Sequence, residues 1–219
     1  MKENYPVFLD LCGKKCLVVG GGAVATRKVK TLLAVKAQVT VVSLQCTGEI
    51  QKLEKQGHIT LIQDEYKESF LQGAFLVISA TNDRRINQQV YRGCVSRNLL
   101  VNVVDDPKHS NFFVPSVVSR GHLSIAISTE GRSPAFARHL REELEQQYGP
   151  EYGEFLEVLG HVRGKVKARV KDQNIRSKLL KEIASPSWLH YFLTHSRKKY
   201  EEKVKALITH YSTTENNNI

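Results

Sequence analysis

Three consecutive glycines near the start of the chain have the spacing of a phosphate-binding loop. Residues 18–25 read Val-Val-Gly-Gly-Gly-Ala-Val-Ala and match the pattern G-x-G-x-x-G/A through Gly20, Gly22 and Ala25. In this pattern the first glycine makes a tight turn, the second lets a pyrophosphate approach the backbone, and the small third residue allows close helix–strand packing. Because the motif lies between an apolar run and a helical pattern, it predicts a dinucleotide site at a helix N-terminus. A glycine turn that binds nothing is the alternative.

The residue that ends the second predicted strand departs from the usual dinucleotide site. Enzymes that use NAD commonly carry Asp or Glu there, and its carboxylate hydrogen-bonds the adenosine ribose. This chain has Ser43, followed by Leu44 and Gln45. A serine hydroxyl can bond a ribose hydroxyl but excludes a 2′-phosphate less firmly than a carboxylate does. No arginine stands beside it to attract that phosphate, so the sequence favours NAD and leaves the strictness of its selection over NADP open.

A carboxylate follows the fifth predicted strand, where acid–base chemistry could take place. Ligands of open α/β sheets bind beyond the carboxyl ends of the strands, so residues 80–83 and 102–106 should lie near the glycine loop. Asp105 would then lie beside a nicotinamide ring, where a base could take the proton that a substrate sheds besides its hydride. The alternative is that Asp105 or Asp106 only caps the turn before Pro107. Position alone does not decide between them.

Residues 129–134, Thr-Glu-Gly-Arg-Ser-Pro, could form a second anion site. A glycine turn, Arg132 and a helix N-terminus beginning at Ser133 would together suit a carboxylate group. An ordinary helix cap with a solvated arginine explains the same residues equally well.

The elements that position these residues are predicted by a regular alternation of short apolar runs and helical patterns in the first two-thirds of the chain. The runs are rich in Val, Ile and Leu without clean alternation, as expected of strands with helices on both sheet faces. The residues Thr81-Asn82-Asp83 supply N-cap chemistry before a helix through about Ser96. The predicted fold class is therefore α/β, with an N-terminal Rossmann-like parallel sheet. Its expected strands are residues 15–19, 38–42, 58–62, 75–80 and 99–104.

The pattern changes after Pro107. Residues 112–119 and 122–128 are extended runs joined at Arg120-Gly121, which predicts a β-hairpin. Ser133-Pro134 is a strong helix start, and that helix should run to about Gln147. The remainder has helical spacing, interrupted at Ser185-Pro186, which predicts a small C-terminal helical domain with a frayed polar end from Ser212. The expected division of the chain is residues 1–113, 114–149 and 150–219.

Composition excludes several classes of protein. The chain has 219 residues, 41% hydrophobic and 25% charged, which is typical of a globular protein. No apolar run approaches the roughly 18 residues of a membrane helix, and the N-terminus lacks the apolar core of a signal peptide. The four cysteines and eight histidines lack the spacing of a metal site, so we expect no bound metal. A reducing cytoplasm suits such a chain best.

The net charge of +10 indicates an anionic partner. Nucleic acid, an anionic membrane or a polyanionic small molecule would each fit a basic surface. Half of the excess lies before residue 151 and half after it. A nucleic-acid tail usually carries its charge as one block, so the even spread argues against nucleic acid as the partner.

Several longer motifs resemble the precorrin-2 dehydrogenase/sirohydrochlorin ferrochelatase family, which also forms the N-terminal part of siroheme synthases. The resemblance runs from about Tyr5 to Tyr148, and the later motifs are more specific than the glycine loop. The matching stretches are residues 18–28, residues 80–83 with Asn87, and residues 102–107, 112–116 and 125–134. The helical tail matches only in kind.

This resemblance implies oxidation of precorrin-2 to sirohydrochlorin with NAD⁺, with Asp105 as the essential acid–base residue. It also implies a homodimer, formed through about residues 114–147. The cofactor contacts that it implies, beyond Gly20 of the loop motif, are Gly22, Ala23, Val24, Ser43, Leu44, Gln45, Thr81 and Val104. Arg120, Arg132, Ser133 and Arg138 are candidates for holding the carboxylates of a tetrapyrrole substrate.

Other functions stay open at this point. Some members of the family also insert Fe²⁺ into sirohydrochlorin, for which Asp105 or His109 could remove pyrrole protons. A regulatory module that senses NAD(H) would keep the glycine loop but would not need Asp105. A nucleic-acid-binding tail would explain the basic C-terminal helices, yet they carry no recognisable reading motif.

Overall fold

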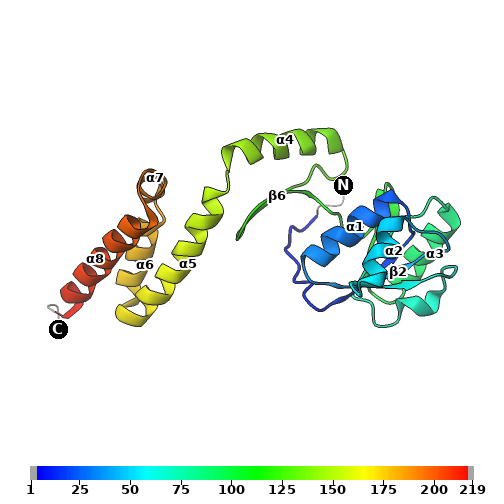
Figure 1. Cartoon of the computed structure of the whole chain (residues 1–219), viewed down its shortest axis with the longest axis horizontal. Coiled ribbons are helices and arrows are strands. Elements are labelled where there is room, and N and C mark those ends of the chain that lie inside the picture. The colour runs from blue at the N-terminus through cyan, green and yellow to red at the C-terminus, as the bar shows by residue number, and fades with distance from the viewer. Residues whose placement is uncertain (1–3, 217–219) are drawn as a thin grey trace. The chain divides into compact units, whose positions relative to one another are not determined.

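The computed structural model describes residues 4–216 (Figure 1). It describes side chains as far as Ser212. Two compact units divide after Val114. The finer division of the second part at residue 149 stays a prediction.

The first unit is built on a parallel sheet of five strands. Its order is β3-β2-β1-β4-β5, so β1 lies in the middle, β2 and β3 are added on one side of it, and β4 and β5 on the other. This arrangement confirms the α/β class, and each strand lies within the range that the sequence predicts. The strands are β1 (Lys15–Val19), β2 (Gln38–Val42), β3 (Ile59–Ile62), β4 (Leu76–Ser79) and β5 (Leu100–Val103).

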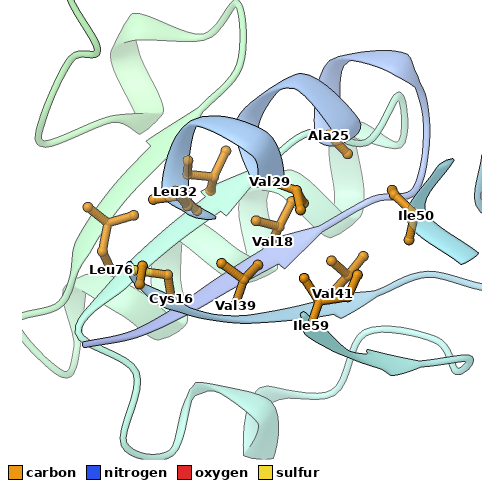
Figure 2. Close-up of a cluster of buried hydrophobic side chains, with 12 residues drawn as sticks. Cys16, Val18, Ala25, Val29, Leu32, Val39, Val41, Ile50, Ile59 and Leu76 are labelled. Carbon is orange, nitrogen blue, oxygen red and sulfur yellow. The ribbon is translucent and has the colours of Figure 1, made fainter. Parts of the chain in front are cut away.

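Helices cover both faces of this sheet, which explains why its strands are apolar throughout. On one face, α1 (Ala23–Ala34) and α2 (Gly48–Lys55) pack on the side chains of alternate strand residues, such as Val18 (Figure 2). On the other face, η1 (Glu68–Leu71) and α3 (Arg84–Val95) pack on the intervening ones. With both faces buried, the parallel strands need no polar side.

The outer edge of β5 is closed by the segment that follows it. The short helix η2 (Pro107–His109) turns the chain back. The Asn111 N–H then donates to the Val101 carbonyl at 2.9 Å, and the Asn111 side-chain oxygen accepts from the Val101 N–H at 2.7 Å. The Asn102 amide donates to the Phe112 carbonyl at 3.0 Å. These bonds satisfy the edge of the sheet and fix the exit of β5, where Asp105 lies.

The second unit begins with the predicted hairpin and helix. The antiparallel strands are β6 (Ser116–Arg120) and β7 (Leu123–Ile127), and β6 starts later than expected because residues 112–115 do not pair with β7. Ser133 caps α4 (Pro134–Gln147), accepting a hydrogen bond from the Phe136 N–H.

Four helices complete the second unit around a core of their own. They are α5 (Glu151–Arg169), α6 (Gln173–Ile183), α7 (Pro186–Thr194) and α8 (Arg197–Asn216). The buried Tyr200 ring packs against Phe155, Trp188 and Phe192. The frayed end predicted from Ser212 is wrong for the described residues, because α8 continues through Asn216. No helix in residues 4–216 has the length and apolar character to cross a membrane.

Candidate active site

The glycine loop lies at the switch point of the sheet, between the carboxyl ends of β1 and β4. Gly20 has φ +117°, and a Cβ there would come within 2.4 Å of the Ala80 carbonyl oxygen. A Cβ on Gly21 would come within 2.1 Å of the Gln45 carbonyl oxygen. A side chain at Gly20 would displace the backbone that follows β4, and one at Gly21 would displace the loop that follows β2, so the glycine loop requires glycine at both positions.

Space for an anion remains above the third glycine. Apart from Gly22 and its two chain neighbours, no described atom lies within 4 Å of where a Cβ on Gly22 would be, and Gly22 is the N-cap of α1. No side chain among the described residues caps this helix, which leaves the first N–H groups of α1, at Ala23 and Val24, without a capping oxygen. An open space before uncapped N–H groups fits the pyrophosphate of a dinucleotide.

Ser43 follows β2 and is held beside the end of β3. Its N–H donates to the Ile62 carbonyl at 3.1 Å, while its hydroxyl donates to the Gln45 carbonyl at 2.7 Å. Since its proton is used in this turn, the Ser43 oxygen offers a ligand only acceptor capacity. The turn exposes the Leu44 side chain.

The start of α3 forms the opposite wall. Asn87 accepts a 2.6 Å hydrogen bond from the Ser79 hydroxyl and donates to the Thr81 carbonyl at 3.0 Å. These bonds tie the helix to the end of β4 and fix the position of Thr81. Asp83 caps α3 by accepting from the Arg85 N–H at 2.8 Å, and the Arg85 guanidinium forms an ion pair with the same carboxylate.

Between these walls lies a pocket of about 600 Å³. It brings together five residues predicted as cofactor contacts: Gly20, Ser43, Leu44, Gln45 and Thr81. Gly22, Ala23 and Val24 lie at the helix start beside it, and Val104 packs on the apolar cluster beneath α1.

Part of this pocket comes from residues that the sequence did not indicate as cofactor contacts. These other lining residues are Val19, Val42, Asp64, Glu65, Tyr66, Asp83, Arg85, Ile86 and Gln89. Three of them follow β3, and the signal that would have found them is the strand order, which sets the end of β3 beside Ser43.

Asp105 lies at the exit of β5 in the left-handed backbone region, with φ +58°. A non-glycine residue is uncommon there, although aspartate tolerates the conformation better than most residues. The side chain is exposed. The capping role that the sequence left open for Asp105 or Asp106 falls to Asp106, which caps η2. Asp105 therefore has a constrained position without a capping function.

Lys28, on α1, interacts electrostatically with Asp105. Burial is the main cause of a lowered pKa for Lys28, the neighbouring Arg27 lowers it further, and Asp105 acts in the opposite direction. The charge of the half-buried Lys28 ammonium group therefore interacts with the carboxylate of Asp105, the candidate base.

Two further residues that can exchange protons, Asp106 and His109, follow Asp105 in the chain. The Asp106 carboxylate lies 2.6 Å from Nδ1 of His109, and the His109 ring packs edge-on against Tyr91. The hydrogen bond from His109 lowers the pKa of the Asp106 carboxyl. When neutral His109 donates from Nδ1, its Nε2 is left as a proton acceptor.

The four candidate substrate contacts belong to the second unit. The Arg120 guanidinium donates to the carbonyls of Ser119, Glu145 and Tyr148. Arg138 pairs with Glu142 at 2.9 Å. Ser133 is the N-cap of α4, and Arg132 lies in the turn before it, where its N–H donates to the Thr129 carbonyl.

Comparison with known proteins agrees with this geometry. The family described as "Putative NAD(P)-binding" matches residues 7–116, and "Sirohaem biosynthesis protein central" matches residues 120–147. A solved structure, "SirC, precorrin-2 dehydrogenase", is 30% identical with a TM-score of 0.79, and the match covers 93% of this chain and 100% of that one. The chain belongs to the precorrin-2 dehydrogenase family.

Curated siroheme synthases are also similar to this family member. The protein from Citrobacter koseri is 40% identical over 171 residues, which are 78% of this chain and 36% of the relative. The protein from Edwardsiella ictaluri is 34% identical over 208 residues, 94% of this chain and 45% of the relative. The chain thus spans less than half the length of these curated relatives.

Proposed function

We propose that the chain is an NAD-dependent dehydrogenase that oxidises precorrin-2 to sirohydrochlorin. The observation that carries the proposal is the position of Asp105, held at the exit of β5 at the same sheet edge as the glycine loop. Family membership supplies the substrate class, and the net charge of +10 suits a polycarboxylate.

The proposed reaction removes two electrons and two hydrogens from precorrin-2, one hydrogen as a hydride and one as a proton. NAD⁺, when bound, supplies the hydride acceptor. The N–H groups that begin α1 would hold the pyrophosphate, and Ser43 and Thr81 would flank the adenosine half. Asp105 takes the proton on its carboxylate and passes it to solvent, for which its exposure is suitable.

We further propose Arg132, Ser133 and Arg138 as partners for the substrate carboxylates, and we place Arg120 last because several of its donors already bind carbonyls. The enzyme would act as a homodimer through residues 114–147, a segment that exposes the apolar Val117 and Phe136. It would work in the cytoplasm, where the cysteines stay free, as the structure has them.

Insertion of Fe²⁺ into sirohydrochlorin is a second candidate activity, favoured by the Asp106–His109 pair. Metal insertion releases two pyrrole protons, and His109 would provide an acceptor besides Asp105. Fe²⁺ added to sirohydrochlorin and the purified chain tests it, and insertion no faster than without protein would reject it.

The decisive experiment mixes the full chain with precorrin-2 and NAD⁺ and follows the absorbance of NADH and sirohydrochlorin. Asp105→Asn keeps the shape of the side chain but removes the base, so we expect turnover to fall by about 10²–10⁴-fold. Binding of NAD⁺ should be unchanged, because Asp105 does not line the nucleotide pocket.

Asp10→Asn is the matched control, since Asp10 is an exposed aspartate of the same unit whose carboxylate only accepts a backbone N–H. Unchanged turnover in Asp105→Asn would reject the role of Asp105. Absence of turnover in the unaltered chain, with NAD⁺ bound, would favour the sensing module instead.

A further inference from the structure

The pocket beside the glycine loop contains carboxylates that the second strand does not supply. In this fold the acidic residue that meets the adenosine ribose usually ends β2, where this chain has Ser43. Asp64 and Glu65 line the same pocket and come from the end of β3.

The sheet places these residues beside the expected ribose site. β2 and β3 are parallel neighbours in which Val42 is opposite Ile62, so both strands end at the same level. The hydrogen bond from the Ser43 N–H to the Ile62 carbonyl continues this pairing by one residue. Asp64 follows Ile62 by two positions and lines the same pocket as Ser43.

The charges that line the pocket are mainly negative. Asp64, Glu65 and Asp83 contribute carboxylates, and Arg85 contributes the one positive charge among the lining residues that the structure describes. Arg85 is paired with Asp83, so its charge is already compensated. Asp64 pairs with Lys67, whereas Glu65 makes no ion pair with any described residue.

We infer that Asp64 and Glu65, which follow β3, select NAD over NADP. In other NAD-binding domains of this fold a carboxylate at the end of β2 has that role. A 2′-phosphate carries two negative charges more than a hydroxyl. It would be repelled by the carboxylates that line this pocket. This inference rests on the proposed nucleotide site and adds to it the residues that determine its specificity.

Isothermal titration of the full chain with NAD⁺ and with NADP⁺ tests the inference, because it measures binding without turnover. The unaltered chain should bind NAD⁺ at least about tenfold more tightly, since one charge pair at about 4 Å in water is worth roughly fivefold in affinity and several act here. Asp64→Asn/Glu65→Gln should narrow this preference by about tenfold, through tighter NADP⁺ binding. Glu65→Gln alone, an exposed substitution that breaks no ion pair, should narrow it by about threefold.

Glu54→Gln is the matched control, because Glu54 is an exposed carboxylate on α2 that does not line the pocket. It should leave the preference unchanged. Repulsion between charges is screened by salt, so raising the ionic strength from about 0.05 to 0.5 M should also narrow the preference of the unaltered chain.

Equal affinity for both dinucleotides, or a preference that neither the variants nor salt changes, would overturn the inference. Binding of neither dinucleotide would instead reject the proposed nucleotide site itself. The two failures are therefore distinguishable in the same titration.

Discussion

For single residues, backbone conformation determines which side chains this site can accommodate. Gly20 is required because the Ala80 carbonyl occupies the place of a Cβ. Asp105, in contrast, carries a side chain although its backbone lies in the left-handed region, which favours glycine. The bonds of Ser110 to Val103 and Asp106 close the loop around it and hold that conformation. The site thus combines one position that excludes side chains with one that fixes a carboxylate.

Cysteine reactivity tests the packing of the same unit. Burial raises the pKa of the Cys16 thiol to about 11 and that of Cys94 to about 12. Only the thiolate reacts, and at pH 8 a thiol of pKa 11 is ionised in about one molecule in a thousand. With Ellman's reagent at pH 8 we expect the exposed Cys12 to react first, and Cys16 and Cys94 to react far more slowly until the protein unfolds.

Cys12→Ser should remove the fast phase and leave the slow ones unchanged. Since ionisation increases with pH, the slow native-state reaction should accelerate as the pH rises from 8 to 10. Rapid labelling of Cys94 in the native protein at pH 8 would contradict the packing of α3 on the sheet.

The candidate site was predictable from the sequence where the evidence was local. The glycine pattern, the strand before it and Asp105 after the fifth apolar run could be placed from neighbours along the chain. Asp64 and Glu65 could not, because their proximity to Ser43 depends on the pairing of β2 with β3. The sequence could not show that Asp106 rather than Asp105 caps η2, because the choice between two adjacent aspartates depends on their backbone angles.

At the element scale, helices and strands were predictable where a terminal signal accompanied the periodicity. The Ser133-Pro134 start placed α4 correctly, and the runs before the glycine loop and at residues 38–42 matched β1 and β2. The helix α2 was missed, since its eight residues have a short pattern with only Thr47 as a cap. The sequence showed the break at Ser185-Pro186, but not those after Arg169 and Thr194, where no proline stands.

Glycines within α5 give a matched test of how this helix packs. A Cβ on Gly153 would lie 2.6 Å from the Arg120 carbonyl oxygen, so the helix approaches the β6–β7 turn too closely for any side chain. Gly160, on the same helix, is exposed, and apart from its chain neighbours and the nearby backbone of α5 no described atom lies within 4 Å of where its Cβ would be.

Gly160→Ala should therefore stabilise the protein by about 0.5–1 kcal/mol through helix propensity. Gly153→Ala gains the same propensity but should destabilise the protein by about 1–3 kcal/mol, because backbone must move. Urea unfolding followed by Trp188 fluorescence measures both. Equal stabilisation by the two substitutions would show that α5 does not pack on the turn.

At the scale of the whole molecule, the chain has two units with separate apolar cores. The core of the first lies on the two faces of its sheet, and that of the second lies among the helices α5 to α8. Chains of this kind need not unfold in one step, and a ligand stabilises only the part whose folded state binds it.

Trp188 and Cys94 allow the two units to be followed separately. Trp188 is the single tryptophan of the chain and is buried in the second unit, while the Cys94 thiol is buried in the first. At a concentration of one hundred times its Kd, NAD⁺ should stabilise the first unit by about 2.7 kcal/mol. Cys94 labelling should therefore need more urea when NAD⁺ is present, whereas the fluorescence midpoint of Trp188 should stay the same. A common shift of both midpoints would show that the units unfold together, and that nucleotide binding at the glycine loop stabilises the whole chain.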